Sequence, residues 1–222
     1  MTSTPKTFLE RHWFGLVIGA SLLFVVPPFL APIFMAIGWS FPGKVIYFIY
    51  SFLCHQLPER SYFLFGQHLT YPLTQIQQAS GVSNPNDIFA LRRFIGNAQL
   101  GWKVAWSDRM ISMYTSLPLL ALIWYPLRRR LPRLPWWGWV LLLLPMAVDG
   151  GTHFLSDFQG VGAGFRDTNL WLAALTQHAF LPTFYAGDAW GSFNSILRLG
   201  TGFLFGLGNV WFGFPILEET FA

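Results

Sequence analysis

One short segment of the chain, FLCHQLPERSYFLFG (residues 52–66), gathers residue types that are capable of chemistry: Cys54, His55, Gln56 and Arg60. A thiol and an imidazole can bind a metal or move a proton, and a guanidinium can bind a carboxylate or a phosphate. Apolar and aromatic residues flank these groups on both sides. The surrounding elements must therefore hold the polar side chains away from lipid.

Each of these residues also has a purely structural interpretation. A lone cysteine is commonly a small buried hydrophobe, and Cys54 is the only cysteine in the sequence. His55 at a helix end can donate to free carbonyls, and Arg60 can anchor at lipid headgroups. A single cysteine excludes an internal disulfide and a multi-cysteine zinc site, and the five histidines are dispersed. The sequence therefore predicts no metal site and no cofactor.

The composition indicates a membrane protein. Of the 222 residues, 53% are hydrophobic, 18% are aromatic and only 11% are charged, whereas soluble domains carry about 25% charged residues. A net charge of +4 is also found in proteins that bind nucleic acid. The cations are spread over short loops, however, where the positive-inside rule explains them. We therefore expect a multi-pass protein in contact with membrane lipid and no nucleic-acid partner.

The fold class predicted from the apolar segments is an all-α membrane helix bundle over one domain, residues 1–222. A spanning helix needs about 20 apolar residues, and about five segments approach that length. Short interfacial helices and no sheet core are expected around them. The predicted spans are about 13–38, 43–57, 111–127, 136–148 and 193–214, with segments outside the membrane at about 58–110 and 152–192.

Local signals refine these spans. Pro27 and Pro28 predict a kink in the first span, and the second is short, at roughly 22 Å. The fourth span should end at Gly150-Gly151, because glycines are typical of helix C-termini. Residues 89–106 have an amphipathic pattern that favours an interfacial helix, and a short helix is expected near 168–180. The glycines of residues 200–208 indicate close helix packing.

The charged loops predict an orientation. Arg128, Arg129, Arg130 and Arg133 form the densest basic cluster, so the loop between the third and fourth spans should be cytoplasmic. With five spans, the N-terminus would then lie outside. Lys6 and Arg11 argue against that placement.

Span parity brings polar residues together at one membrane face. The second span ends at Cys54 and His55, the third begins after Arg109, the fourth ends at Asp149 and the fifth begins near Arg198. A charged residue inside a span costs several kcal/mol unless it is paired or faces a polar cavity. We therefore predict one polar cluster, in which Asp149 contacts Arg198 or Arg109. Such a pair is either structural or part of a functional site.

Four blocks of the chain resemble the DUF2085 family of predicted bacterial membrane proteins. They are residues 54–66 (CHQLPERSYFLFG), 96–114 (GNAQLGWKVAWSDRMISMY), 145–151 (PMAVDGG) and 197–208 (LRLGTGFLFGLG), in order over most of the chain. The resemblance implies a bacterial inner-membrane location. It assigns no catalytic residue, because the family is named for its unknown function. The signature positions that it implies are Cys54, His55, Gln56, Pro58, Arg60, Ser61, Asp149, Gly150 and Arg198.

The chain departs from this family pattern at one place. Relatives usually carry one or two further cysteines around an arginine at the start of the third span, where this chain has Ser107, Asp108, Arg109 and Met110. A thiol pair or metal site built from those cysteines would be absent here. Arg109 is retained, and Cys54 is left without a second thiol.

Three functions remain open from the sequence. The first is a non-catalytic membrane protein, such as an accessory subunit of a membrane complex with other protein subunits. The second is an enzyme or carrier that acts on an anionic or phosphorylated lipid, with Arg60, Arg109 and Arg198 as headgroup ligands and Asp149 or His55 as proton carrier. The third is a metal, haem or redox protein. No catalytic constellation is complete, so no residue is assigned a catalytic role.

Overall fold

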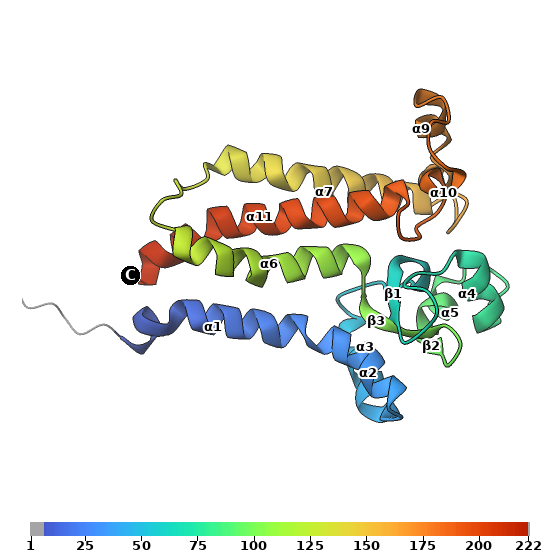
Figure 1. Ribbon diagram of the computed structural model, residues 1–222, viewed down its shortest axis with the longest axis horizontal. Helices are drawn as coiled ribbons and strands as arrows, with labels where there is room; N and C mark the ends of the chain where they lie inside the picture. The colour runs from blue at the N-terminus through green and yellow to red at the C-terminus, as the bar shows by residue number, and fades with distance from the viewer. Residues whose placement is uncertain (1–6, 222) are drawn as a thin grey trace, which may run out of the picture.

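Four helical stretches of the chain are long and apolar enough to cross a membrane, as judged by length and composition over the described residues. They are Phe8–Ala36, Asp108–Leu127, Trp136–Asp157 and Phe193–Phe221. The computed structural model describes residues 7–221, and the predicted helix bundle is confirmed. Lys6, which bears on the predicted orientation, lies outside the described residues. Figure 1 shows the long helices side by side at one end and shorter elements at the other.

The spanning part consists of α1 (Phe8–Val25), α6 (Asp108–Leu127), α7 (Trp136–Asp157) and α11 (Phe193–Phe221). Glycines on α11 let its neighbours approach closely, as predicted. A Cβ at Gly202 would lie 2.9 Å from the Ser112 side chain on α6, and one at Gly208 would lie 3.0 Å from Leu143 on α7. Larger residues at these positions would force the helices apart.

The first predicted span is kinked where its prolines lie. Helix α1 ends at Val25 and α2 (Pro27–Ala36) begins directly after Val26. Proline has no amide hydrogen and its ring clashes with the preceding turn, so Pro27 and Pro28 interrupt the helical ladder. The kink that the sequence predicted is confirmed, and α2 leaves the line of α1 in Figure 1.

The segment predicted as a second span, residues 43–57, is not among the candidate spans of the described residues. Its helix, α3 (Ser40–Tyr50), has 11 residues, which gives it a length of about 17 Å. That is too short for a hydrocarbon core of about 30 Å. Residues 51–57 leave the helix and turn, with Gln56 at a positive φ of 52°. The structure therefore has four candidate spans where about five were expected.

A three-stranded antiparallel sheet occupies a region where the sequence predicted no sheet. The order is β1 (Ser61–Leu64), β3 (Gly101–Ser107), β2 (Gly96–Asn97), with Ser61 opposite Ser107 and Phe63 opposite Lys103. The interfacial helix expected over 89–106 is only α5 (Ile88–Arg93). Helix α5 ends at Arg93 because the backbone of Phe94 is extended, and Gly96 and Gly101 supply the positive φ angles of the β2–β3 hairpin that follows. Strand β3 is buried almost throughout, so it lacks the alternation that marks a half-exposed strand.

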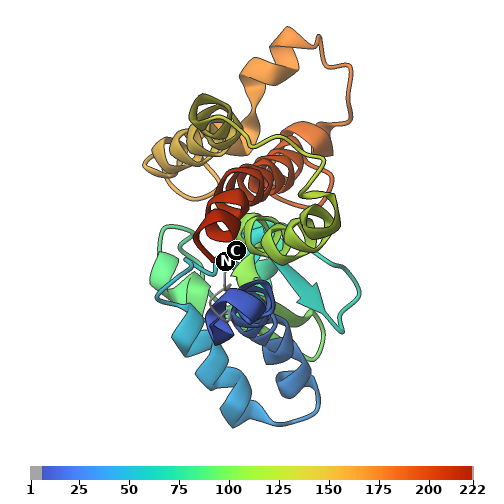
Figure 2. The ribbon, with the colours of Figure 1, turned by 90° about the vertical axis from the view of Figure 1, so that its left-hand side faces the viewer.

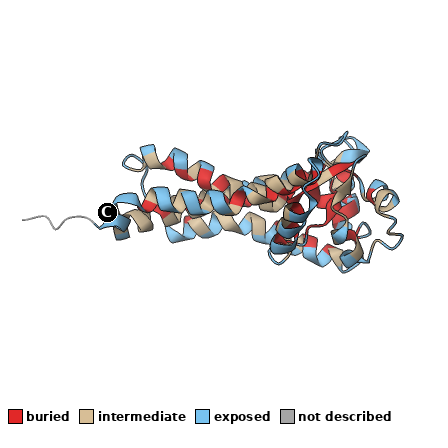
Figure 3. Cartoon of the chain, turned by 90° about the horizontal axis from the view of Figure 1, so that it is seen from below, coloured by how far each residue is buried: buried red, intermediate tan, exposed pale blue. Residues whose placement is uncertain are grey.

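The other short elements lie beside this sheet or in the loop between α7 and α11. We call residues 51–107 and 158–192 together the cap. Figure 3 shows that buried residues are concentrated in the cap, whereas much of the bundle surface is exposed. The short elements are η1 (Pro58–Arg60), α4 (Leu73–Ser80), α8 (Phe165–Thr168), α9 (Leu170–Leu175) and α10 (Pro182–Tyr185). Helices α8 and α9 lie close to the short helix expected at 168–180.

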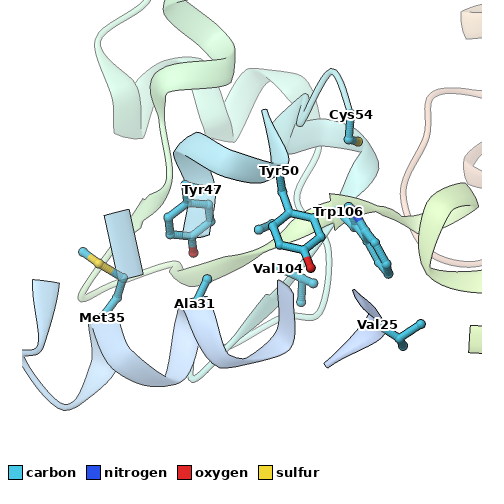
Figure 4. Packing of buried hydrophobic residues seen from close by; sticks show 9 residues of the cluster. Val25, Ala31, Met35, Tyr47, Tyr50, Cys54, Val104 and Trp106 are labelled. Carbon is cyan, nitrogen blue, oxygen red and sulfur yellow. The ribbon is translucent and has the colours of Figure 1, made fainter. Parts of the chain in front are cut away.

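One apolar core joins the α2–α3 hairpin to β3. Figure 4 shows that Cys54 lies at the edge of this core, near Tyr50 and Trp106. The hydroxyl of Tyr47 donates to the carbonyl of Lys103, which ties α3 to the strand. The buried members are Val25, Ala31, Met35, Tyr47, Tyr50, Cys54, Val104, Ala105 and Trp106.

The chain ends of the described residues lie at the same end of the bundle as the loop between α6 and α7 (Figures 1 and 2). Arg11 on α1 therefore lies at the same end as Arg128 and Arg133. The expectation that the N-terminus lies opposite the basic loop is wrong, because it depended on a fifth span. With four candidate spans in the described residues, Arg11 and the basic loop both favour the same side of the membrane.

Candidate functional site

The candidate site lies where the bundle meets the cap. Helix α6 begins there, α7 ends there and α11 begins there (Figure 1). Helix α7 continues to Asp157 instead of ending at the glycines, so Asp149 and Gly150 lie within it. The ion pairs of the site are Arg109–Asp149 at 2.7 Å, Arg166–Asp149 at 2.7 Å, Arg60–Asp157 at 2.7 Å, Arg60–Asp188 at 2.8 Å, Arg198–Asp108 at 2.8 Å and Arg198–Asp188 at 2.6 Å.

One part of this network carries a local excess of positive charge. Asp149 accepts from Arg109 through Oδ2 and from Arg166 through Oδ1. One carboxylate therefore serves two guanidinium groups. Arg166 also donates to Thr152 and Asn194, so each of its three guanidinium nitrogens makes one hydrogen bond. Arg109 keeps donors that the network does not use.

The other part of the network carries a local excess of negative charge. Arg60 and Arg198 are paired with three carboxylates, Asp108, Asp157 and Asp188. Burial alone would raise the pKa of Asp188, but Arg198 and Arg60 hold that pKa well below its usual range. Asp188 is therefore an anion in the folded protein, fixed between two arginines.

The predicted contact of Asp149 with Arg109 is confirmed. Asp149 and Arg198 form no direct pair, because Arg198 is held by Asp108 and Asp188. Arg60 folds back to the cluster as expected from the turn at Pro58. It balances Asp157 and Asp188, however, and not Asp149.

A cavity of about 240 Å³ opens beside Arg109. Gly150 makes room for the guanidinium, since a Cβ there would lie 3.0 Å from Arg109 Nη1. Arg109 Nε is buried and has no hydrogen-bond partner among the described residues. The lining also includes Cys54, His55, Arg60, Ser107, His153, Asp157 and Arg198, with Leu53, Met110 and Phe154 as apolar wall. We call this space the Arg109 cavity.

Two histidines line the Arg109 cavity. His55 Nδ1 accepts the amide hydrogen of Leu57 at 3.0 Å, so its neutral ring carries the proton on Nε2. His153 is buried on α7, with Nε2 3.4 Å from Asp188 Oδ1. Neither ring nitrogen of His153 makes a hydrogen bond within the described residues. His55 therefore keeps its Nε2–H for a molecule in the cavity, whereas both ring nitrogens of His153 are buried and its Nε2 faces Asp188.

Cys54 and Gln56 fix the turn that precedes this cavity. Cys54 Sγ accepts the amide hydrogens of Ser107 and Gln56, each at 3.4 Å, which joins the turn to the start of α6. Gln56 Nε2 donates to the carbonyl of Tyr47, and the Gln56 carbonyl accepts from Lys103 Nζ. Cys54 borders the cavity, as predicted for the rim of the cluster, whereas Gln56 does not line it.

Several members of the site were missed from the sequence. Arg166 and Asp188 belong to the loop between α7 and α11, and Asp157 and His153 lie on the part of α7 beyond its predicted end. Their spacing follows no recognisable motif. Asp108 was visible as the neighbour of Arg109, and its place in the first turn of α6 suits the helix dipole.

The described residues contain no group of three or more histidine, cysteine, aspartate or glutamate side chains that could hold a metal ion. Most of the charged side chains of the site are held in ion pairs with one another. Arg109 and His55 keep guanidinium or ring nitrogens that the network does not use, and a polar group can bind there.

Comparisons with known proteins agree with a membrane location. The sequence model of a family described as "Predicted membrane protein (DUF2085)" matches residues 98–212. An uncharacterised protein of Methanocaldococcus jannaschii is 27% identical over 217 residues, which cover 94% of this chain and 95% of that protein. This relative is archaeal, so the similarity extends beyond bacteria. No solved structure matches the chain.

Proposed function

Since the chain belongs to the DUF2085 family of predicted membrane proteins and is a multi-pass membrane protein, we propose that it binds the anionic headgroup of an amphiphile in the Arg109 cavity. The observation that carries this proposal is the sharing of Asp149 between Arg109 and Arg166. One carboxylate cannot neutralise two guanidinium groups, and Arg109 Nε still lacks an acceptor. An anion at Arg109 would supply both the charge and the acceptor.

The apolar wall of the cavity favours an amphiphile over a free anion. Leu53 and Phe154 line the cavity and are also exposed on the outer surface, Phe154 from the spanning helix α7. A headgroup at Arg109 would thus have lipid-facing side chains beside it. The volume of about 240 Å³ suits a headgroup rather than a whole lipid. These contacts support binding, and no catalytic residue is assigned.

The test compares Arg109→Gln with wild-type protein in nanodiscs made of phosphatidylglycerol and phosphatidylcholine. Asp149 keeps its pair with Arg166 in this variant, so the fold should survive. The expected result is that wild-type protein retains phosphatidylglycerol and that Arg109→Gln loses about ten-fold or more of that preference. Bound lipid is measured by mass spectrometry after delipidation.

Arg128→Gln is the matched control, because Arg128 pairs with Glu218 at the opposite end of the bundle. It should retain the lipid as wild-type protein does. A second arm with inorganic phosphate separates a headgroup site from a site for the free anion. Equal lipid retention by Arg109→Gln and wild-type protein would refute the proposal.

A second candidate function is that of an accessory subunit in a membrane complex. The observation that favours it is the arm formed by α9 and α10, which extends away from the bundle in Figure 2. This arm exposes large apolar side chains, with Trp171 at 50% and Leu175 at 74% exposure. Cross-linking from a photoreactive residue at position 174 in native membranes tests this function. A protein subunit should be captured by wild-type arm residues and lost with Leu175→Glu, whereas labelling of lipid alone would count against it.

The basic end of the bundle suggests the orientation. We place the protein in the inner membrane of a bacterial cell with Arg11 and residues 128–133 in the cytoplasm, since positive charge favours that side. The Arg109 cavity and the cap would then face outward.

A further inference from the structure

Glu59 is a buried carboxylate that has no hydrogen-bond partner within residues 7–221. It lies in the 3₁₀ turn η1 and is only 4% exposed. Neither of its oxygens makes a hydrogen bond within the described residues. An unsatisfied buried carboxylate is costly, and native proteins rarely retain one without a reason. Its neighbour Arg60 is engaged by Asp157 and Asp188 instead.

Glu59 lines a cavity of about 360 Å³ inside the cap. The wall is built from η1, the segment that leads into α4, the loop after α7, helix α8 and the loop after α10. Asp167 and Asp188 are the other acids of the lining, and no lysine, arginine or histidine contributes to it among the described residues. The cavity therefore presents three carboxyl groups and no basic side chain of its own.

These three carboxyl groups differ in what they still can accept. Asp188 is engaged by Arg60, Arg198 and Asn194. Asp167 accepts the amide hydrogen of Gly164 through Oδ2. Glu59 accepts no hydrogen bond within the described residues, and both of its oxygens are buried behind the cavity wall to which the residue contributes. The lining would therefore be complemented by a ligand that carries hydrogen-bond donors and a positive charge.

We propose that this cavity binds a small organic cation whose ammonium group pairs with Glu59. A metal ion fits less well, because the described residues bring no three potential metal ligands close enough together to hold one. Pro72, Leu73 and Val161 supply apolar wall for the carbon skeleton of an amine. The ring of Tyr71, also in the wall, can contact a cation through its face.

The ionisation of Glu59 agrees with this assignment. Burial raises its pKa to about 7, against the lowering effect of Arg60. The other charged groups that act on it are Asp188 and Lys103. At pH 8 the carboxyl group is therefore largely an anion and can receive an ammonium ion.

This site is separate from the Arg109 cavity, because the two linings have no residue in common and opposite unmet charge. The test uses full-length protein in detergent at pH 8, with putrescine and ethanolamine as probes and sodium chloride at matched ionic strength as reference. Putrescine or ethanolamine should raise the midpoint of thermal unfolding of wild-type protein. Glu59→Gln should lose that shift, with affinity lower by about ten-fold or more.

Glu219→Gln is the matched control, since Glu219 is exposed and pairs with Arg133 at the far end of the bundle. It should keep the full shift. If Glu59→Gln does not fold, Asp167→Asn replaces it, because the amide oxygen can still accept from Gly164. An equal shift in the variant tested, no shift with either amine in wild-type protein, or an equal shift with Mg²⁺ would each overturn the proposal.

Discussion

Asp149 Oδ1 lies 2.7 Å from Arg166 Nη2, while its Oδ2 lies 2.7 Å from Arg109 Nη2. The carboxylate thus joins a spanning helix, α7, to both α6 and the cap. Asp149 is 3% exposed and the Arg166 side chain 6%, whereas the Arg109 side chain is 22% exposed. Asp149 is the common partner of two arginines, so its loss leaves two guanidinium groups without their anion, whereas the loss of either arginine leaves the other one paired.

Asp149→Asn should destabilise the protein more than Arg109→Gln. The asparagine leaves two guanidinium groups without an anion, and removal of one partner from a buried pair costs about 3–5 kcal/mol. Arg109→Gln leaves Asp149 with Arg166. The double variant should be less damaging than the sum of the two single changes. Thermal unfolding in detergent measures all three, and additive losses would contradict the coupling.

Cys54→Ser should cost less than Arg60→Ala. Serine can still accept the amide hydrogens that now reach Cys54 Sγ, and it loses only a small apolar group from the core. Arg60→Ala leaves Asp157 and Asp188 short of a partner, at a cost of about 3–5 kcal/mol. Folded yield and thermal unfolding compare the two variants.

Arg133→Ala serves as a control for Arg60→Ala, because its pair with Glu219 is exposed. A surface pair contributes little, about 0–1 kcal/mol. If Cys54→Ser proves more damaging than Arg60→Ala, the thiol has a role beyond packing, and a redox or metal function would gain support.

The sequence predicted the helix bundle, the kink and the end of the bundle where charge gathers. Those features follow from the lengths of the apolar segments and from the order of the spans, and both are visible in the sequence itself. The partners within the charged cluster could not be read in the same way. Asp188 is 128 positions from Arg60, and no spacing relates the two. The excess of charged groups at one face predicted a network, but the loop between α7 and α11 decides its pairs.

The sheet was missed for a different reason. A strand buried on both faces resembles any apolar run, and WKVAW in β3 carries a lysine that looks solvent-facing. Lys103 is fully buried, however, with Nζ bonded to the carbonyls of Gln56 and Arg92. Lys103 can be buried because turns elsewhere in the chain supply these backbone acceptors, and the residues around Lys103 do not predict them.

In the absence of an amine, the free energy of unfolding should decrease as the pH rises from about 5 to about 7. Burial raises the pKa of Glu59 from 4.5 to about 7, so the folded state holds a proton that the unfolded state has lost. Burial likewise raises the pKa of Asp167, to about 6. Glu59→Gln should remove about half of this loss and be more stable than wild type at pH 8 by roughly 3 kcal/mol.

Above neutral pH, Lys103 should make the free energy of unfolding increase as the pH rises. Burial lowers its pKa from 10.5 to about 7, so between these values the unfolded state binds the additional proton and stability rises with pH. Thermal unfolding from pH 5 to pH 10 should therefore show a minimum near neutrality. A flat profile in wild-type protein, or the same acid-side slope in Glu59→Gln, would contradict this assignment.

A reporter at each end of the bundle should show that the cap lies outside the cell. The C-terminus lies at the same end as the loop between α6 and α7, where Arg128, Arg129, Arg130 and Arg133 gather (Figure 1). A green fluorescent protein fused to the C-terminus should therefore fluoresce, as it folds in the cytoplasm. Alkaline phosphatase inserted in the exposed turn after α9 should be active, since it needs an oxidising compartment.

Replacing the four arginines of the loop by glutamine serves as a topology control and should lower both signals, because positive charge sets the orientation. An active phosphatase at the C-terminus would invert the orientation and place the Arg109 cavity and the Glu59 cavity on the cytoplasmic side.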